Sequence, residues 1–205
     1  PSVEVFPFSY GSEEAPDLAH LAERHLPDPG RRVDAWARRF LAPGGQTRTL
    51  RMLEAMTAAI REEFAYEARD TPGTNPPVVT LETRRGACRD FALLMMEAAR
   101  SLGLAARFVS GYVYETAAQA TTGGGATHAW VAIYVPGAGW IEYDPTNGLV
   151  AGDHLIRVGV TRTPEQAVPV GGGYIGDPMD FVALSVDVAV QVGDEPPAQD
   201  APQPA

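Results

Sequence analysis

The strongest constraint on the fold of this chain is a change in the spacing of apolar residues close to Gly103. Before that glycine, apolar side chains recur every three or four residues, which is the spacing of one face of an α-helix. Two such stripes are present: Leu53, Met56, Ile60 and Phe64, and then Phe91, Leu94, Met95, Ala98 and Leu102. After the glycine, apolar and polar residues alternate, which is the period of a β-strand. Helices followed by strands predict an α+β fold, with N-terminal helices packed on an antiparallel sheet.

The expected boundaries follow from these periods and from clusters of proline and glycine. We expect a short helix near 18–25, helices at about 33–41 and 49–63, and a longer helix that begins after Arg85 and ends before Gly103. Strands are expected at 107–115, 128–135, 140–144, 155–160 and 181–191. The 205 residues suffice for one domain, which we expect at 31–192. Residues 1–30 are interpreted as an irregular lead-in, and residues 193–205, which lack bulky apolar side chains, as a disordered tail.

The net charge and the hydropathy of the chain limit the kinds of molecule that we expect as its partners. The formal net charge of -10 makes a nucleic acid an unexpected partner, because an acidic surface repels phosphates. No apolar run approaches the roughly 20 residues that span a bilayer, so no membrane partner is expected. No basic and then apolar leader precedes the first acidic residues, which favours a cytoplasmic protein. The chain begins at Pro1 and not at Met, so a leader or a further module could precede it.

Cys88 is the single cysteine, which rules out a disulfide within the chain. A lone cysteine is often just a small buried hydrophobe. Here it follows Gly86 and falls in the first turn of the expected helix, where unpaired N–H groups and the helix dipole favour a thiolate. Arg84, Arg85 and Arg89 add positive charge nearby. This setting favours a nucleophile.

A thiolate nucleophile needs a base, and the base needs an orienting partner. Of the four histidines, His20 and His25 lie in the polar lead-in, and His154 follows an aspartate in a loop. His128 instead opens an alternating strand, on the same face as Trp130. We therefore select His128 as the base.

Asp144 ends the next expected strand, directly before a proline, and Glu142 lies on the same face. A hairpin between the two strands would bring Asp144 beside His128. For both side chains to share a face, the connecting loop must contain an odd number of residues or a bulge must intervene. We predict a loop of three or five residues, with Glu142 as the reserve orienting group.

Four motifs together resemble a known family. They are Gly86-Ala-Cys-Arg-Asp-Phe-Ala92, Leu102-Gly-Leu-Ala-Ala-Arg-Phe-Val-Ser-Gly-Tyr112, Thr127-His-Ala-Trp-Val131 and Trp140-Ile-Glu-Tyr-Asp-Pro-Thr-Asn147. Over roughly residues 50–190, they resemble the bacterial transglutaminase-like superfamily, whose members are often labelled cysteine proteases. The resemblance implies a papain-like α+β core, in which the cysteine heads a helix packed on the sheet that carries the histidine and the aspartate. It also implies a catalytic triad of Cys88, His128 and Asp144. Many relatives carry a β-rich module before this domain, which this chain lacks, and their loop before the histidine is richer in aspartate.

The chemistry that we expect is acyl transfer on an amide or peptide bond of a protein or peptide substrate, with hydrolysis favoured. The alternatives are protein-glutamine transglutaminase activity and a catalytically silent binding module on the same fold. The backbone N–H of Cys88 and the hydroxyl of Tyr66 are candidate oxyanion donors, and Trp130 is a candidate shield for the ion pair. Asp90 is expected to favour the helix N-terminus. No cofactor or metal is expected, because CxxC and HxxxH spacings and EF-hand-like loops are missing from the sequence.

Overall fold

The computed structural model describes residues 5–69, 71–114, 122, 127–150, 152, 154–168, 173–180, 182 and 188. The helices are α1 Ala15–Ala22, α2 Arg32–Arg38, α3 Thr49–Glu63, α4 Pro77–Thr83 and α5 Cys88–Ser101, with short 3-10 turns η1 Pro29–Arg31, η2 Pro164–Ala167 and η3 Pro178–Asp180. The strands are β1 Val5–Phe6, β2 Thr47–Arg48, β3 Ala65–Tyr66, β4 Arg85–Gly86, β5 Ala106–Val113, β6 Thr127–Val135, β7 Gly139–Asp144, β8 Leu149–Val150 and β9 Leu155–Thr161. No helix of the described residues is both long and apolar enough to cross a membrane.

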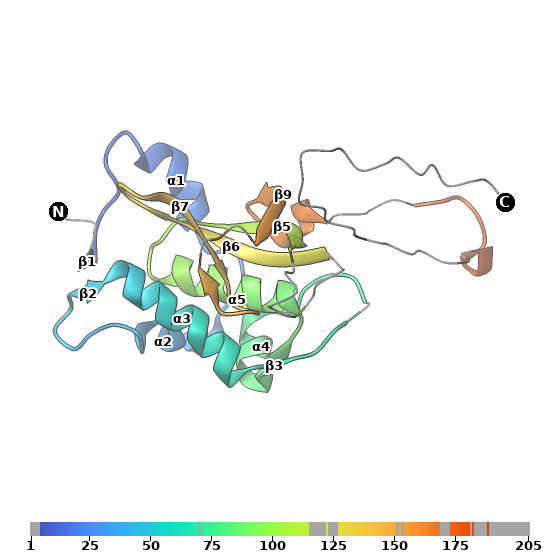
Figure 1. The fold of residues 1–205 in the computed structure, drawn as a ribbon, viewed down its shortest axis with the longest axis horizontal. Helices are drawn as coiled ribbons and strands as arrows, with labels where there is room; N and C mark the ends of the chain where they lie inside the picture. The colour runs from blue at the N-terminus through green and yellow to red at the C-terminus, as the bar shows by residue number, and fades with distance from the viewer. Residues whose placement is uncertain are drawn as a thin grey trace.

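A five-stranded antiparallel sheet forms the second half of the fold, in the order β8-β7-β6-β5-β9. Helices α2, α3, α4 and α5 lie on one side of it and α1 lies on the other side, and α5 is the helix that packs on β5 and β6 (Figure 1). Two-stranded pairings join β1 to β2 and β3 to β4. The predicted α+β class, with helices first and an antiparallel sheet afterwards, is confirmed.

Helix α5 is buried on nearly all sides, because α2 and α4 cover the face that turns away from the sheet. Its charged residues Glu97 and Arg100 are therefore buried as well, and they pair at 2.9 Å. The remaining donors of Arg100 bind the carbonyl oxygens of Leu21, Ala106 and Arg162. Additional hydrogen bonds of this kind offset part of the cost of burying an ion pair. The pair thus ties the lead-in and the end of β9 to the central helix.

Strand β6 runs through the middle of the sheet and is buried on both faces. Ala129, Val131 and Ile133 belong to the main core with α5, whereas Trp130 and Ala132 pack in a smaller cluster on the other face. The neighbouring strand approaches this smaller cluster closely at Gly111, where a Cβ atom would lie 2.0 Å from the carbonyl oxygen of Ile156. A glycine is therefore required at this point of the sheet.

The predicted elements agree with the structure in most places. The helix at 49–63 and the strand at 155–160 are present almost to the residue. Helix α4 was not predicted, since Pro76 and Pro77 indicated a loop, but proline is well accommodated in the first turn of a helix. The lead-in contains β1 and α1. The predicted tail at 193–205 and nearly all of the predicted strand at 181–191 lie outside the described residues.

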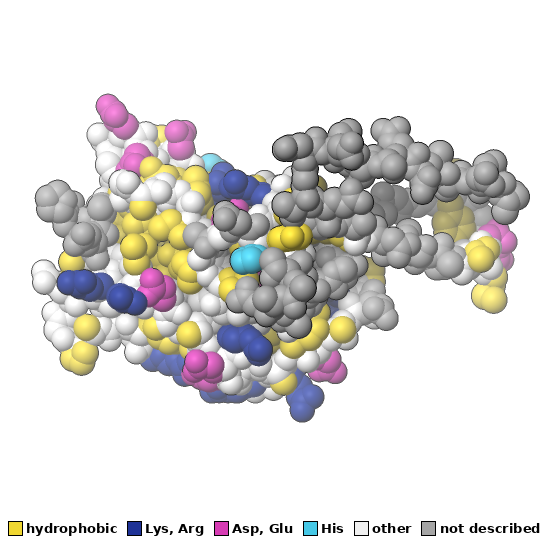
Figure 2. All heavy atoms as spheres, viewed as in Figure 1, with side chains coloured by type: hydrophobic (Ala, Val, Ile, Leu, Met, Phe, Trp, Pro, Cys, Tyr) yellow, Lys and Arg dark blue, Asp and Glu magenta, His cyan; other side chains and the backbone are white. Residues whose placement is uncertain are grey.

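Charged side chains of the described residues are interspersed on the face drawn in Figure 2, where basic and acidic groups surround patches of apolar ones. Several charged side chains of the described residues form ion pairs, such as Arg39 and Arg84 with the two carboxylate oxygens of Glu63. Pairs of this kind contribute little stability individually. The charges on this face therefore form a mixed surface.

Candidate active site

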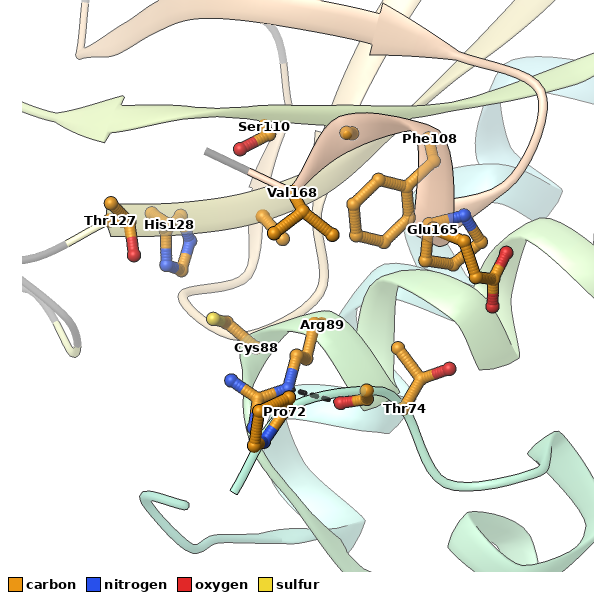
Figure 3. Close-up of a pocket in the computed structure, with 14 residues that line it drawn as sticks. Pro72, Thr74, Cys88, Arg89, Phe108, Ser110, Thr127, His128, Glu165 and Val168 are labelled. Carbon is orange, nitrogen blue, oxygen red and sulfur yellow. Dashed lines mark hydrogen bonds between the residues drawn. The ribbon is translucent and has the colours of Figure 1, made fainter. Parts of the chain in front are cut away.

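The three residues singled out in the sequence come from the ends of three elements. Cys88 is the first residue of α5, His128 is the second residue of β6, and Asp144 is the last residue of β7. In Figure 3 the Cys88 sulfur points toward the His128 ring across the mouth of a cavity. The packing of α5 on β6 therefore brings together a thiol and an imidazole that are 40 positions apart in the sequence.

The hairpin between β6 and β7 sets the position of Asp144. Val135 pairs with Gly139, which leaves a connection of three residues, 136–138. The register then places Glu142 opposite Ala132, so that Asp144, two residues further on, falls on the same face as His128. The predicted loop of three residues is confirmed. The His128 Nε2 atom lies 2.8 Å from Asp144 Oδ2, and both side chains are fully buried.

The Asp144 carboxylate is held by three further donors. Its Oδ1 atom accepts the backbone N–H groups of Thr146 at 2.9 Å and Asn147 at 3.3 Å, and its Oδ2 atom accepts the Asn147 side-chain amide at 2.8 Å. The Asn147 amide also exchanges two hydrogen bonds with the backbone of Thr122. Sequence reasoning missed Asn147. Its signal was the Asp-Pro-Thr-Asn run, since aspartate often binds backbone donors two or three residues on.

His128 is held in its charged form by its neighbours. Burial opposes the charge, but the hydrogen bond to Asp144 and the nearby Cys88 thiol outweigh it and raise the pKa of His128 to about 10. Because Nε2 is engaged by Asp144, Nδ1 is the nitrogen left for the thiol. Nδ1 has no hydrogen bond of ordinary length to any described residue. Such looseness between a nucleophile and its base is common before substrate binds.

Cys88 is almost buried, with 9% of its surface exposed, and it starts the helix. The N–H groups of a first helical turn lack acceptors within the helix and favour negative charge there. Of the nearby arginines, Arg84 pairs with Glu63, and Arg89 donates hydrogen bonds to backbone carbonyls. Their guanidinium groups thus have other partners, and the helix start is the clearer electrostatic support for a thiolate.

Asp90 organises the helix start and does not reach the thiol. Its carboxylate is fully buried and accepts two hydrogen bonds of 3.0 Å from Arg69, one of 2.7 Å from the Asn75 N–H and one of 2.9 Å from the Ala87 N–H. The Ala87 contact closes the first turn of α5, as in one half of a capping box. The Arg69 and Asn75 contacts hold the preceding segment against the helix. Asp90 is therefore a positioning residue.

The remaining candidate residues, Tyr66, Trp130 and Glu142, have different surroundings. Tyr66 on β3 pairs with Gly86, and it is 40% exposed. Burial and then the charge of Cys88 raise the pKa of Tyr66, against the opposing influence of Arg89. Trp130 is fully buried and stacks on the His128 ring, with the ring centroids 6.0 Å apart. Glu142, the reserve orienting group, forms an ion pair with Arg157 at 3.3 Å, and Asp144 is the carboxylate that reaches the imidazole.

A cavity of about 400 Å³ opens beside Cys88 and His128. This volume suits a small ligand or an amino-acid side chain. Five separate stretches of the chain form its walls: 72–74, 88–89, 108–110 of β5, 127–129 of β6, and 164–168. Its polar groups include the hydroxyl side chains of Thr74, Ser110 and Thr127. Within the described residues, no group of three or more metal-binding side chains is present.

Residues 34–145 match the family model of the transglutaminase-like superfamily, which is more than half of the chain. The uncharacterized protein ML0607 of Mycobacterium leprae is 37% identical over 110 residues, covering 53% of this chain and 37% of that protein. The uncharacterized protein Rv2569c of Mycobacterium tuberculosis is 31% identical over 151 residues, covering 70% of this chain and 48% of that protein. The chain thus spans less than half the length of these curated relatives.

The solved structure of a candidate cysteine protease from Cytophaga hutchinsonii has the same fold. It superposes with a TM-score of 0.62 at 22% sequence identity, and the match covers 81% of this chain and 53% of that one. At this identity the likeness concerns the fold alone, and the chemistry of the present chain must be argued from its own residues.

Proposed function

The chain belongs to the transglutaminase-like superfamily, and on this basis we propose that it is a thiol-dependent acyl-transfer enzyme acting on an amide or peptide bond. One observation carries the proposal: Cys88 heads a helix beside His128, whose Nε2 atom lies 2.8 Å from the buried Asp144 carboxylate. Thiol catalysis needs a nucleophile, a base beside it and a group that orients the base. The adjoining cavity supplies room for a protein or peptide substrate.

The reaction begins with attack of the Cys88 thiolate on the amide carbonyl carbon, which forms a C–S bond and pushes the carbonyl electrons onto oxygen. When the tetrahedral intermediate collapses, the C–N bond breaks and the His128 imidazolium protonates the departing amine. A water molecule then attacks the thioester carbon and forms a C–O bond, while His128 removes one of its protons. When this second tetrahedral intermediate collapses, the C–S bond breaks, which releases the acid and restores the thiolate. Asp144 keeps the imidazole oriented and stabilises its charge throughout.

The oxyanion of the intermediate needs hydrogen-bond donors. The Cys88 N–H, at the first position of α5, is the first donor that we propose. The Tyr66 hydroxyl is the second, supported by its electrostatic proximity to Cys88 and by the raised pKa that keeps its proton in place. Trp130, stacked on the imidazole, is proposed to shield the pair from water.

We propose water as the favoured acyl acceptor. The cavity wall at 164–168 includes Val168, which is 59% exposed, and this part of the cavity is therefore open to solvent. The test is to measure how an acyl-enzyme formed on a denatured protein substrate partitions between water and a labelled primary amine. The chain contains no lysine, so its own side chains do not compete as amine acceptors. Predominant incorporation of the amine at millimolar concentration would instead identify a transglutaminase.

Nucleophilic reactivity is tested with iodoacetamide and intact-protein mass spectrometry near neutral pH. Cys88 is the sole cysteine, so any alkylation reports on it alone. We expect fast alkylation that slows at least tenfold in His128→Gln, together with loss of amide turnover in both His128→Gln and Cys88→Ser. His20→Gln is the matched control, because this exposed residue lies on α1. A Cys88 that stays inert in the wild type would identify a silent binding module.

A further inference from the structure

Apart from the His128 imidazolium, which faces Asp144 and Cys88, the cavity beside Cys88 is lined by two charged side chains, Arg89 and Glu165, and they differ in what they bind. The Arg89 guanidinium donates hydrogen bonds to the carbonyl oxygens of Gly73 at 2.6 Å, Thr71 at 2.6 Å and Arg69 at 2.9 Å. It is therefore occupied with holding the cavity wall. The Glu165 carboxylate is exposed and makes no hydrogen bond or ion pair with any described residue. The charge available to a ligand from these walls is negative.

Glu165 is carried by a turn that is anchored to the core. It lies in η2, whose start is capped by the Gln166 side chain, which accepts the N–H groups of Arg162 and Thr163. The Arg162 carbonyl oxygen in turn accepts a hydrogen bond of 2.7 Å from the buried Arg100 of α5. The turn is thus fixed to the same helix that begins with Cys88, so the backbone that carries Glu165 has a defined position relative to the nucleophile.

The space between the nucleophile and this carboxylate is apolar. In Figure 3, Cys88 and His128 lie at one end of the cavity, Glu165 lies at the other end, and Phe108 and Val168 lie between them. A side chain that filled this space would bury an apolar stem against Phe108 and Val168 and present its tip to the carboxylate. Arginine and lysine side chains have this form, with a methylene stem and a cationic head.

We infer that the cavity selects substrates with an arginine- or lysine-type side chain next to the amide that is attacked. This inference deepens the proposed function and rests on it. The stem packs between Phe108 and Val168, and the cationic head pairs with Glu165. The net charge of -10 also favours cationic substrates, because it attracts them over a longer range than the contact with Glu165. Acidic side chains are disfavoured, since they would meet Glu165 without a free cation of the described cavity walls to balance them.

The inference is tested with three peptidyl chloromethyl ketones that alkylate the thiol and differ only at one residue: arginine, its neutral isostere citrulline, and glutamate. The readout is the second-order rate of Cys88 labelling by mass spectrometry, which needs no amide turnover. We expect arginine to react about two- to fivefold faster than citrulline, which is the size of effect that a solvent-exposed ion pair gives. Glutamate is expected to be slowest, and 1 M NaCl should bring the three rates together.

Glu165→Gln should remove the preference for arginine over citrulline, which is read as the ratio of the two labelling rates within the variant. Glu13→Gln makes the same change at an exposed position on the lead-in and should keep the preference. Equal rates for arginine and citrulline in the wild type, with Cys88 still reactive, would overturn the inference and leave the proposed function standing. A Cys88 that reacts with none of the three probes would overturn both.

Discussion

At the scale of single residues, Asp144 and Glu142 lie two positions apart on β7, but they have different partners. Asp144→Asn removes the charge that stabilises the imidazolium and keeps the shape of the side chain. We expect kcat/KM for amide hydrolysis to fall by roughly 1,000- to 10,000-fold, as when a triad aspartate is made neutral. Glu142→Gln, the same change at the reserve position, should stay within twofold of the wild type. If Glu142→Gln were the more damaging substitution, the assignment of the orienting group would be wrong.

The charge of His128 also predicts how stability depends on pH. Its pKa in the folded protein, about 10, lies above the ordinary value of 6.5, so folding favours the protonated form. The resulting stabilisation is present in full below about pH 6.5 and is lost as the pH rises toward 10. We expect the difference in free energy of unfolding between the wild type and His128→Gln, measured in urea at pH 6, 8 and 10, to shrink with pH. A difference that does not vary with pH would contradict the raised pKa.

At the scale of elements, Asp90 joins the start of α5 to the segment that precedes α4. Asp90→Ala leaves Arg69 and two backbone N–H groups without their acceptor in a largely buried place. We expect a loss of about 3 kcal/mol in the free energy of unfolding, measured with urea. Glu54→Ala breaks an exposed ion pair with Arg51 on α3 and should cost less than about 0.5 kcal/mol. Equal losses in the two variants would show that Asp90 does not anchor the segment.

The close approach of β5 and β9 gives a second prediction for an element. In Gly111→Ala the new methyl group would lie 2.0 Å from the Ile156 carbonyl oxygen and 2.7 Å from the Trp130 ring, so the sheet must shift. We expect a loss of about 3 kcal/mol in unfolding free energy and slower thiol labelling, because Trp130 stacks on His128. Gly159→Ala on β9 meets no atom within 4 Å and serves as the control. Its stability should match that of the wild type or slightly exceed it.

At the scale of the whole molecule, the reactivity of Cys88 should depend on the intact fold. An unfolded cysteine has a pKa near 8.5, so roughly 0.3% of it is thiolate at pH 6. We therefore expect iodoacetamide labelling at pH 6 to slow at least tenfold as urea unfolds the protein, in step with the change in tryptophan fluorescence. Faster labelling on unfolding would mean that Cys88 is merely a buried thiol that the fold protects.

The sequence predicted those features that depend on local pattern. The spacing of apolar residues indicated α3 and α5. The requirement that His128 and Asp144 share a face of the sheet correctly predicted an odd number of residues in the loop between β6 and β7. Contacts between distant segments could not be predicted, such as the Arg69–Asp90 pair and the hydrogen bonds of Arg89 to 69–73. The cavity could not be predicted for the same reason, because five separate stretches of the chain form it. Helix α4 was missed because two prolines indicate a turn as readily as a helix start.

The connection at 136–138 has a consequence for how relatives of this chain can vary in length. Adding or deleting one residue there would turn Asp144 to the opposite face of the sheet, whereas a change of two residues would keep its orientation. Insertions and deletions at this hairpin should therefore involve an even number of residues, or be accompanied by a β-bulge that restores the orientation of Asp144. A protein engineer who grafts a segment onto this chain at the hairpin has the same restriction on the length of the graft.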